Sequence, residues 1–282
     1  MQKKHELEKI STVISNHKLK PKKSLSQNFL LDLNLTKKIA ESVNNLGSCD
    51  ILEIGPGPGA LTRSLLSLGA RKVVVIEKDV QFLGPLQEIS DFYPGRLTIV
   101  HGDVLSMEAE KLLRPPIKIV SNLPYNIGTK ILINYLTVEK WPPFWESLTF
   151  MFQEEVANRL VALPKTKSYG RLSIITQWRS TVKTLFKVPS TAFTPVPKVE
   201  SAVVQIIPSK QENFKINHQT LQRVVKLAFN QRRKMLRQSL KNLHPEILTI
   251  LPKVGIDPKS RPEELSIDQF CELAVIIEHC NT

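Results

Sequence analysis

Short β-branched runs alternate with helical patterns through the first two thirds of this 282-residue chain. Five runs are long enough for buried strands, and successive runs start about 20 to 30 residues apart, which leaves room for one helix between each pair. The pattern predicts an α/β fold, a parallel sheet with helices on both faces. The predicted strands are Asp50–Ile54, Lys72–Glu77, Leu97–His101, Ile117–Ser121 and Leu148–Phe152.

The pattern changes after the fifth predicted strand. Arg171–Trp178 has helical spacing, and Thr181–Val188 and Ser201–Pro208 are typical of two further strands. Three prolines within Pro189–Pro197 predict a stiff extended loop between those strands. Beyond about Pro208, apolar residues recur at helical spacing, which indicates a small all-α domain. We therefore expect a basic N-terminal tail over residues 1–21, an α/β domain over 22–208 and a helical domain over 209–282.

The positive charge of the chain is concentrated in two segments. Lys and Arg number 39 against 26 Asp and Glu, a net charge of +13. Residues 1–23 contribute +5 and residues 213–245, with eight basic side chains and no acid, contribute +8, so the rest of the chain is neutral overall. Phosphate backbones neutralise such segments and release condensed counterions. The distribution favours nucleic acid over an acidic membrane, since neither segment has a large apolar face, although either segment alone is more typical of a solvated helix face.

The cysteine pattern and the hydropathy exclude several other classes of protein. Cys49, Cys271 and Cys280 form no Cys-x-x-Cys pair and have no histidine at ligand spacing, which argues against a disulfide scaffold or a structural metal. No apolar run approaches the roughly 18 residues of a membrane span, and Met1–Lys23 lacks the apolar core of a secretory signal. We expect a cytoplasmic protein that needs neither a metal nor a membrane.

Glycine and acidic residues follow the first three predicted strands. The first strand runs into Gly55-Pro56-Gly57-Pro58-Gly59, where missing Cβ atoms let the backbone approach a ligand and the next helix offers free amide groups. Glu77, 22 residues after Gly55, is placed to accept hydrogen bonds from ribose hydroxyls, and Asp103 is placed to accept one from an adenine amino group. Alone, the glycine loop is ambiguous between a cofactor loop and an ordinary tight turn, and an aspartate at a strand end is more often a helix cap. Together they predict a crevice for a nucleoside cofactor or a dinucleotide.

The fourth predicted strand runs into Asn122-Leu123-Pro124-Tyr125. Proline ends the strand ladder, so Asn122 and Tyr125 should project into the crevice. The amino nitrogen of adenine is a poor nucleophile because its lone pair is delocalised into the ring. The Asn122 side-chain oxygen and the Leu123 carbonyl can accept both of its N–H bonds and free that lone pair for attack on a methyl group, while Tyr125 stacks on the base. The alternative is an Asn-x-Pro turn beside a core tyrosine.

These motifs resemble the class I S-adenosylmethionine-dependent methyltransferases that modify adenine N6. The chain as a whole resembles the adenine dimethyltransferases of small-subunit ribosomal RNA, with matching stretches in order from about residue 22 to about residue 270. Two positions depart from the family pattern: Ser26, where glycine is usual, and Lys165, which follows proline where glycine often does. The matching stretches are Lys22–Leu30, Phe152–Ala157, Tyr169–Ser173, Phe193–Ser201, Ala228–Lys234, Gly255–Pro258 and Arg261–Glu263.

The resemblance implies a Rossmann-like, mostly parallel sheet of seven strands, a small helical domain and S-adenosylmethionine as cofactor. It implies a monomer that acts on the small ribosomal subunit during ribosome biogenesis, and places two methyl groups on each of two adjacent adenosines near the 3′ end of its RNA. By position, the cofactor would be bound by Asn28, Leu30, Gly55, Glu77, Asp103 and Asn122. The flipped adenine would meet Asn122, Leu123, Tyr125 and Phe193, the last facing Tyr125 across the base. The RNA phosphates would meet Arg223, Arg232, Arg233, Lys234 and Arg237.

Three other functions use some of the same features. A large-subunit rRNA adenine methyltransferase shares the glycine loop and the tetrapeptide Asn122–Tyr125, but the stretch Gly255–Pro258 favours the small subunit. A non-catalytic assembly factor is disfavoured as the sole role because that tetrapeptide is intact. A nicotinamide dehydrogenase is disfavoured because no acid or base suited to hydride transfer stands beside the glycine loop.

Overall fold

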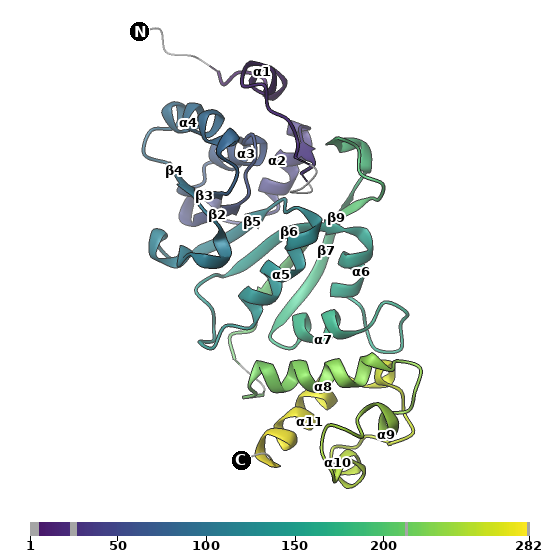
Figure 1. The fold of residues 1–282 in the computed structure, drawn as a ribbon. Coiled ribbons are helices and arrows are strands. Elements are labelled where there is room, and N and C mark those ends of the chain that lie inside the picture. Colours follow the sequence, from purple (N-terminus) through teal and green to yellow (C-terminus); the bar gives the residue numbers. More distant parts are fainter. Residues whose placement is uncertain (1–5, 23–26, 212–213, 281–282) are drawn as a thin grey trace. The chain divides into compact units, whose positions relative to one another are not determined.

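The computed structural model describes residues 6–22, 27–211 and 214–280, which pack as two compact units (Figure 1). The first unit contains residues 1–132, 143–154 and 183–207, and the second contains residues 133–142, 155–182 and 208–282. Residues 155–182 thus pack with the C-terminal helices rather than with the strands that precede them. They do so because Ile174 and Trp178 of this segment are buried in one hydrophobic core with Leu221 and Val224.

A seven-stranded sheet has the order β4-β3-β2-β5-β6-β9-β7. The strands from β2 to β6 pair in parallel, and β9 pairs antiparallel with β6. Every strand predicted from the sequence is confirmed, with end points within one residue of the prediction. The bounds are β2 Asp50–Ile54, β3 Lys72–Glu77, β4 Leu97–His101, β5 Ile117–Ser121, β6 Ser147–Gln153, β7 Ser180–Val188 and β9 Ser201–Pro208.

The sheet reverses its direction of growth between β2 and β5. The chain adds β3 and β4 on one side of β2 and then returns to place β5 on the other side, where Glu53 is in register with Val120. The loops that follow β2 and β5 therefore diverge at the carboxyl ends of neighbouring strands. Such a reversal opens a crevice, which is where ligands bind in sheets of this kind.

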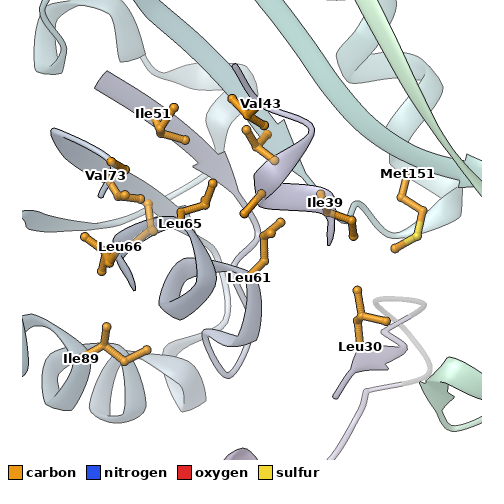
Figure 2. Close-up of a cluster of buried hydrophobic side chains, with 14 of the residues drawn as sticks. Leu30, Ile39, Val43, Ile51, Leu61, Leu65, Leu66, Val73, Ile89 and Met151 are labelled. Carbon is orange, nitrogen blue, oxygen red and sulfur yellow. The ribbon is translucent and has the colours of Figure 1, made fainter. Parts of the chain in front are cut away.

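Both faces of the central strands β2, β3 and β5 are buried. Leu61, Leu65 and Leu66 share one face of α3 (Ala60–Ser67) and point at Ile51 and Val73, and α2 (Leu33–Glu41) and α4 (Leu83–Phe92) complete this layer (Figure 2). Side chains alternate along a strand, so the neighbours of these sheet residues lie on the opposite face. Those neighbours are fully buried as well and include Leu52, Val74 and Ile119.

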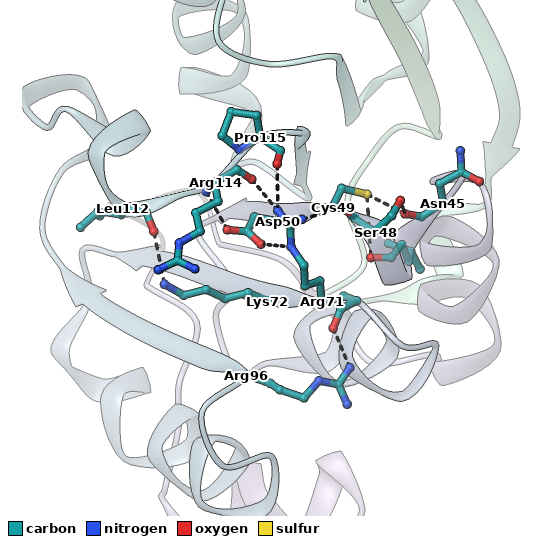
Figure 3. A network of polar contacts seen from close by, with 12 residues as sticks. Asn45, Ser48, Cys49, Asp50, Arg71, Lys72, Arg96, Leu112, Arg114 and Pro115 are labelled. Carbon is teal, nitrogen blue, oxygen red and sulfur yellow. Dashed lines mark hydrogen bonds and ion pairs between the residues drawn. The ribbon is translucent and has the colours of Figure 1, made fainter.

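A polar network lies at the amino ends of the strands, away from the crevice (Figure 3). Asp50 begins β2 and is 2% exposed. Its carboxylate accepts a hydrogen bond of 2.7 Å from Arg71 Nε and another of 2.7 Å from the Arg114 backbone N–H. Arg71 also donates to the Ser48 carbonyl. Asp50 and Arg71 thus link the segments that precede β2, β3 and β5, so the role of this ion pair is structural.

The segment Pro189–Pro197 differs from the single extended loop that its prolines predict. Ser190–Ala192 forms a 3-10 turn, and β8 (Phe193–Thr194) pairs antiparallel with β1 (Phe29–Leu30). The expectation of one extended loop was wrong because this short ladder depends on residues more than 160 positions apart, which no local pattern reports. The ladder sets Leu30 opposite Phe193.

The N-terminal segment contains a helix that its lysine-rich composition does not indicate. Helix α1 (Ile10–Asn16) buries Ile10 and Val13, which lie one turn apart. Just beyond it, His17 Nε2 lies 2.7 Å from Glu88 Oε1 of α4. Helix α5 (Tyr125–Leu136) begins beside the crevice, just after β5 ends.

The second unit has its own apolar core. Helix α8 (His218–Asn230) packs against α7 (Arg171–Gln177) and α11 (Ile267–Cys280), and Phe229 lies between the rings of Tyr169 and Phe270 at 6.3 and 5.9 Å. The helical character predicted for this region is confirmed. The other helices among the described residues are α6 Glu154–Leu160, α9 Leu236–Ser239 and α10 Ile247–Lys253, with 3-10 turns at Leu46–Ser48, Val80–Phe82, Val104–Ser106, Ala109–Leu112 and Pro262–Glu264.

Candidate active site

A cleft in the first unit opens at the carboxyl ends of β2, β3 and β5. Its empty space, counted together with the open solvent at its mouth, is about 740 Å³. The structure brings together, on the walls of this one cleft, eight residues that the sequence analysis singles out. They are Asn28, Leu30, Gly55, Glu77, Asn122, Leu123, Tyr125 and Phe193.

The glycine loop owes its shape to positive φ angles. Gly55, Gly57 and Gly59 have φ of 64°, 54° and 87°, a region that other residues rarely adopt. A Cβ on Gly59 would also lie 2.3 Å from Ile89 Cδ1, whereas Cβ atoms on Gly55 and Gly57 would meet nothing within 4 Å. Gly59 is therefore required for packing, and Gly55 keeps the wall of the cleft bare.

Glu77 holds this loop from the neighbouring strand. Its carboxylate accepts hydrogen bonds from the backbone N–H of Asp79 at 2.8 Å and of Gly57 at 3.1 Å. Burial raises the pKa of Glu77, and these two N–H groups oppose that shift because they stabilise the charged form. The side chain thus braces the loop and lines the cleft.

Asp103 lies on an adjoining cleft that shares Gly55, Glu77 and Leu123 with the first. The Leu105 backbone N–H donates to Asp103 Oδ1 at 3.0 Å, and Lys78 Nζ lies 3.0 Å from Oδ2. Both contacts hold the pKa of Asp103 below its usual value, the N–H most of all. Asp103 therefore caps the 3-10 turn Val104–Ser106 and also places a carboxylate beside the crevice. The two roles considered for it in the sequence, helix cap and ligand acceptor, are compatible.

All four residues of the tetrapeptide after β5 line the cleft. Leu123 is buried, Asn122 and Tyr125 are half-buried, and Tyr125 is the first residue of α5. The Tyr125 hydroxyl lies 2.6 Å from Ser201 Oγ of β9. Burial raises the pKa of Tyr125, so its phenol is neutral at physiological pH. Phe193, 2% exposed, lines the same cleft.

Two residues of the site were missed by the sequence analysis. Glu53 lines the cleft, is 1% exposed and accepts a hydrogen bond of 2.7 Å from Thr62 Oγ1. Burial raises the pKa of Glu53 to about 8. Gln27 also lines the cleft and donates to Asp79 Oδ2 at 3.2 Å. The sequence did contain a signal for Glu53, because it is an ionisable residue inside a strand whose other residues after Asp50 are apolar. Ser26, where the family pattern has glycine, lies outside the described residues.

The predicted RNA-contacting residues belong to the second unit and differ in environment. Arg223, Arg233, Lys234 and Arg237 are exposed. Arg232 is half-buried and donates instead to a loop of the same unit. It donates to the Lys167 carbonyl at 2.9 Å and to the Thr166 carbonyl at 3.3 Å, and its Nε lies 3.7 Å from Glu263 Oε2.

The loop that Arg232 holds contains the second departure from the family pattern. Lys165 has φ of 67°, where glycine is at ease, and its N–H donates to the Glu263 carbonyl at 2.7 Å. The loop therefore keeps a glycine-like backbone although the residue is lysine.

Neither a metal cluster nor a membrane span is found in the part of the chain that the structure describes. Residues 6–22, 27–211 and 214–280 contain no group of three or more His, Cys, Asp or Glu that could hold a metal ion. Over the same residues, no helix is both long enough and apolar enough to cross a membrane.

The mostly parallel seven-stranded sheet and the cleft beside its glycine loop define a class I methyltransferase. Two solved structures share the fold. A dimethyladenosine transferase from Plasmodium falciparum is 22% identical with a TM-score of 0.74, over 88% of this chain and 96% of that one. The 23S rRNA methyltransferase ErmE is 27% identical with a TM-score of 0.66, over 89% of this chain and all of that one.

The chain belongs to the ribosomal RNA adenine dimethylase family, whose sequence profile matches residues 18–279. Curated relatives named ribosomal RNA small subunit methyltransferase A are similar over most of their length. The protein of Paracoccus denitrificans is 54% identical over 93% of both chains, and that of Dinoroseobacter shibae is 55% identical over 93% of this chain and 94% of the relative. The resemblance seen in the sequence is confirmed: the protein is a methyltransferase enzyme with S-adenosylmethionine as its cofactor.

Proposed function

We propose that this enzyme transfers four methyl groups to small-subunit ribosomal RNA, two to N6 of each of two adjacent adenosines near the 3′ end, during ribosome biogenesis. The observation that carries the proposal is the shared cleft of the glycine loop and Asn122–Tyr125, which sets amine acceptors beside the cofactor region. The names of the curated relatives support the small subunit as substrate.

The residues of the two adjoining clefts fit S-adenosylmethionine. Glu77 supplies a carboxylate for the ribose hydroxyls, and Asp103 supplies one for the adenine amino group. Gly55 leaves the backbone open to the methionine portion, and Asn28 and Leu30 flank it from the N-terminal segment. When bound, the cofactor supplies an electrophilic methyl group on a positively charged sulfur.

The target adenine must leave its stack, because N6 is out of reach within a helix. The half-buried Tyr125 offers a ring face to the extruded base, and stacking of this kind contributes about 1–3 kcal/mol per base. Phe193 lines the same cleft but is only 2% exposed, so it must become more exposed before it can stack on the base. The Asn122 side-chain oxygen and the Leu123 carbonyl accept the two N–H bonds of the amine. Its lone pair is then available on the side that faces the methyl group.

The second methylation of each adenine makes a different demand on these residues. One N–H remains after the first transfer, so one of the two acceptors loses its partner and the site must also admit a methyl group. The second step therefore depends more on room beside Tyr125 and Phe193 than on hydrogen bonding. The amine loses its proton to water after each transfer.

Contact with RNA phosphates is assigned to the exposed basic residues of the helical domain, residues 209–282, together with the basic segment over residues 1–21. Arg223, Arg233, Lys234 and Arg237 are free to approach phosphate, and Arg232 supports them from within the unit. We place the enzyme in the cytoplasm, where bacterial ribosomes are assembled, and propose that it acts as a monomer, as the family resemblance implies.

The acceptor pair is tested by Asn122→Ala, with the exposed Asn34→Ala as the matched control. Isolated small subunits that lack the modification are incubated with labelled S-adenosylmethionine, and subunit binding is measured in parallel. Asn122→Ala should lose methyl transfer and keep subunit binding, and Asn34→Ala should behave as the wild type. Full dimethylation by Asn122→Ala would refute the acceptor pair.

The same assay distinguishes the alternatives. Methylation of isolated large subunits, with none on small subunits, would identify the large-subunit activity. Binding of small subunits by the wild type without any methyl transfer would identify a pure assembly factor.

A further inference from the structure

Two carboxyl groups are buried in one cleft without a described cation beside them. Glu53 of β2 and Glu77 of β3 are 1% and 5% exposed and line the same cleft. Among the described residues that line it, none is Lys, Arg or His. Two like charges in a poorly solvated site repel, so one of the two carboxyls is favoured in its neutral, protonated form.

Hydrogen bonding identifies which carboxyl keeps the proton. Glu77 accepts two backbone N–H bonds, which stabilise a carboxylate. Glu53 accepts one bond among the described residues, from the Thr62 hydroxyl of α3. Its register partners on the neighbouring strands, Val75 and Val120, are apolar and fully buried.

The charged group that acts on Glu53 from a neighbouring element is Glu77, and it acts against ionisation. Its partners on β5 and α3, Val120 and Thr62, are uncharged. The cations of those two elements, Lys118 and Arg63, donate instead to the Asn44 and Glu8 carbonyls. Burial, the largest cause, raises the pKa of Glu53 to about 8, so this carboxyl is mostly protonated near neutral pH.

We propose that Glu53 is a carboxylic acid in the cofactor-free enzyme and becomes a carboxylate when S-adenosylmethionine binds, so that cofactor binding releases a proton. The cofactor carries two positive groups, the sulfonium and the α-ammonium, and one carboxylate. A positive charge in this cleft stabilises the ionised form of Glu53. The O–H bond of the carboxyl breaks and its proton passes to solvent, while the cofactor keeps all its bonds.

Release of this proton should make the cleft selective for positively charged ligands. A ligand without positive charge leaves Glu53 protonated, because it offers no compensation for a second negative charge. A cation-bearing ligand is favoured, and its affinity rises with pH while the free enzyme still holds the proton. The affinity for S-adenosylmethionine should therefore fall up to about tenfold per pH unit below pH 8, until the pKa of the bound state is reached.

The test is isothermal titration of S-adenosylmethionine near pH 7 in several buffers that differ in heat of ionisation. The slope of the observed heat against the buffer's ionisation heat gives the number of protons released. The wild type should release roughly 0.5 to 1 proton, since a carboxyl with a pKa of about 8 is largely protonated there. The cofactor's own amino group, with a pKa of about 7.7–8.0, would take up a proton on binding and contributes with the opposite sign.

Three further titrations identify the source of the proton. Glu53→Gln, which keeps the shape and the bond with Thr62, should release almost none, and the exposed Glu41→Gln should match the wild type. 5′-Methylthioadenosine, which has neither positive group, should release none from the wild type. The proposal is overturned by release from Glu53→Gln equal to that of the wild type, which would assign the proton to Glu77, or by equal release with methylthioadenosine.

A second measurement does not depend on a variant. Carbon-13 NMR of the enzyme labelled at glutamate carboxyls should show one buried carboxyl that titrates near pH 8 without cofactor and is ionised at pH 7 with it. A Glu53 carboxyl already ionised at pH 6 without cofactor would overturn the proposal. The inference rests on the cofactor and not on the RNA substrate. Binding heat that does not vary with the buffer, and so shows no proton release, would overturn it and leave the proposed methylation intact.

Discussion

The hydroxyl of Tyr125, the first residue of α5, lies 2.6 Å from the hydroxyl of Ser201, the first residue of β9. Ser201 is fully buried and 76 residues away along the chain. The bond ties the ring beside the cleft to a strand of the sheet. The aromatic face is therefore fixed before a base arrives, which lowers the entropy lost on stacking.

Ser201→Ala should slow methyl transfer without weakening the cofactor complex. Loss of one such hydrogen bond corresponds to about 0.5–1.5 kcal/mol, so we expect a roughly two- to tenfold fall in kcat with the Kd of S-adenosylmethionine unchanged. Tyr125→Phe should match it, because the ring stays and the same bond is lost. Steady-state kinetics and calorimetry measure the two quantities, and an unchanged kcat in both variants would show that the bond does not position the ring.

Two glycines of the same loop should respond differently to alanine. In Gly59→Ala, a φ of 87° and a Cβ 2.3 Å from Ile89 Cδ1 add strain and overpacking, with an expected loss of about 2 kcal/mol or more in the free energy of unfolding. Gly55→Ala has open space and should lose roughly 1 kcal/mol of stability, but its methyl group enters the cleft and should weaken the cofactor complex more strongly. Denaturant titration and calorimetry separate the effects; equal loss of stability would contradict the assignment.

Substitution of Arg232 should lower stability, whereas substitution of its exposed neighbours should weaken RNA binding. Arg232→Ala removes the hydrogen bonds to Thr166 and Lys167 and should lower Tm by a few degrees. The double reversal Arg233→Glu, Lys234→Glu should leave Tm nearly unchanged, weaken RNA binding and reduce the salt slope by about one for each phosphate that is no longer neutralised. Thermal unfolding and binding at several salt concentrations test both, and an unchanged salt slope in the double variant would exclude these two side chains from phosphate binding.

The cofactor-free protein should lose stability as the pH rises toward 8. The pKa of Glu53 is raised to about 8 in the folded state from 4.5 in an exposed chain, so the folded state favours the proton. The stability this proton contributes is complete below pH 4.5 and is lost progressively as the pH rises through the folded value. Between about pH 5 and pH 8, the wild type should lose roughly 2–4 kcal/mol relative to Glu53→Gln. Denaturant unfolding at both pH values measures the difference, and parallel behaviour of the two proteins would contradict a raised pKa.

The strand–helix alternation and the chemistry of the loops were predictable from the sequence because both are local. Hydrophobic periodicity reports which residues are buried, and the glycines near Gly55 and the proline at Pro124 punctuate the chain wherever it folds. Parallel strands end at a common edge, so the placement of Glu77, Asp103 and Asn122 on two adjoining clefts at that edge also followed from the pattern. Family resemblance added the substrate and the cofactor.

The sequence by itself determined the order of the strands along the chain, the loops that follow them and the position of the cleft at their carboxyl ends. Tertiary structure alone decided that Leu30 pairs with Phe193, that Ser201 holds Tyr125 and that Arg232 bonds to the loop at Lys167. It also decided that Glu53 is buried beside Glu77 with one hydroxyl as its partner. Each of these depends on which distant segments pack together, and a carboxyl's charge state depends on the burial and the neighbours that such packing creates.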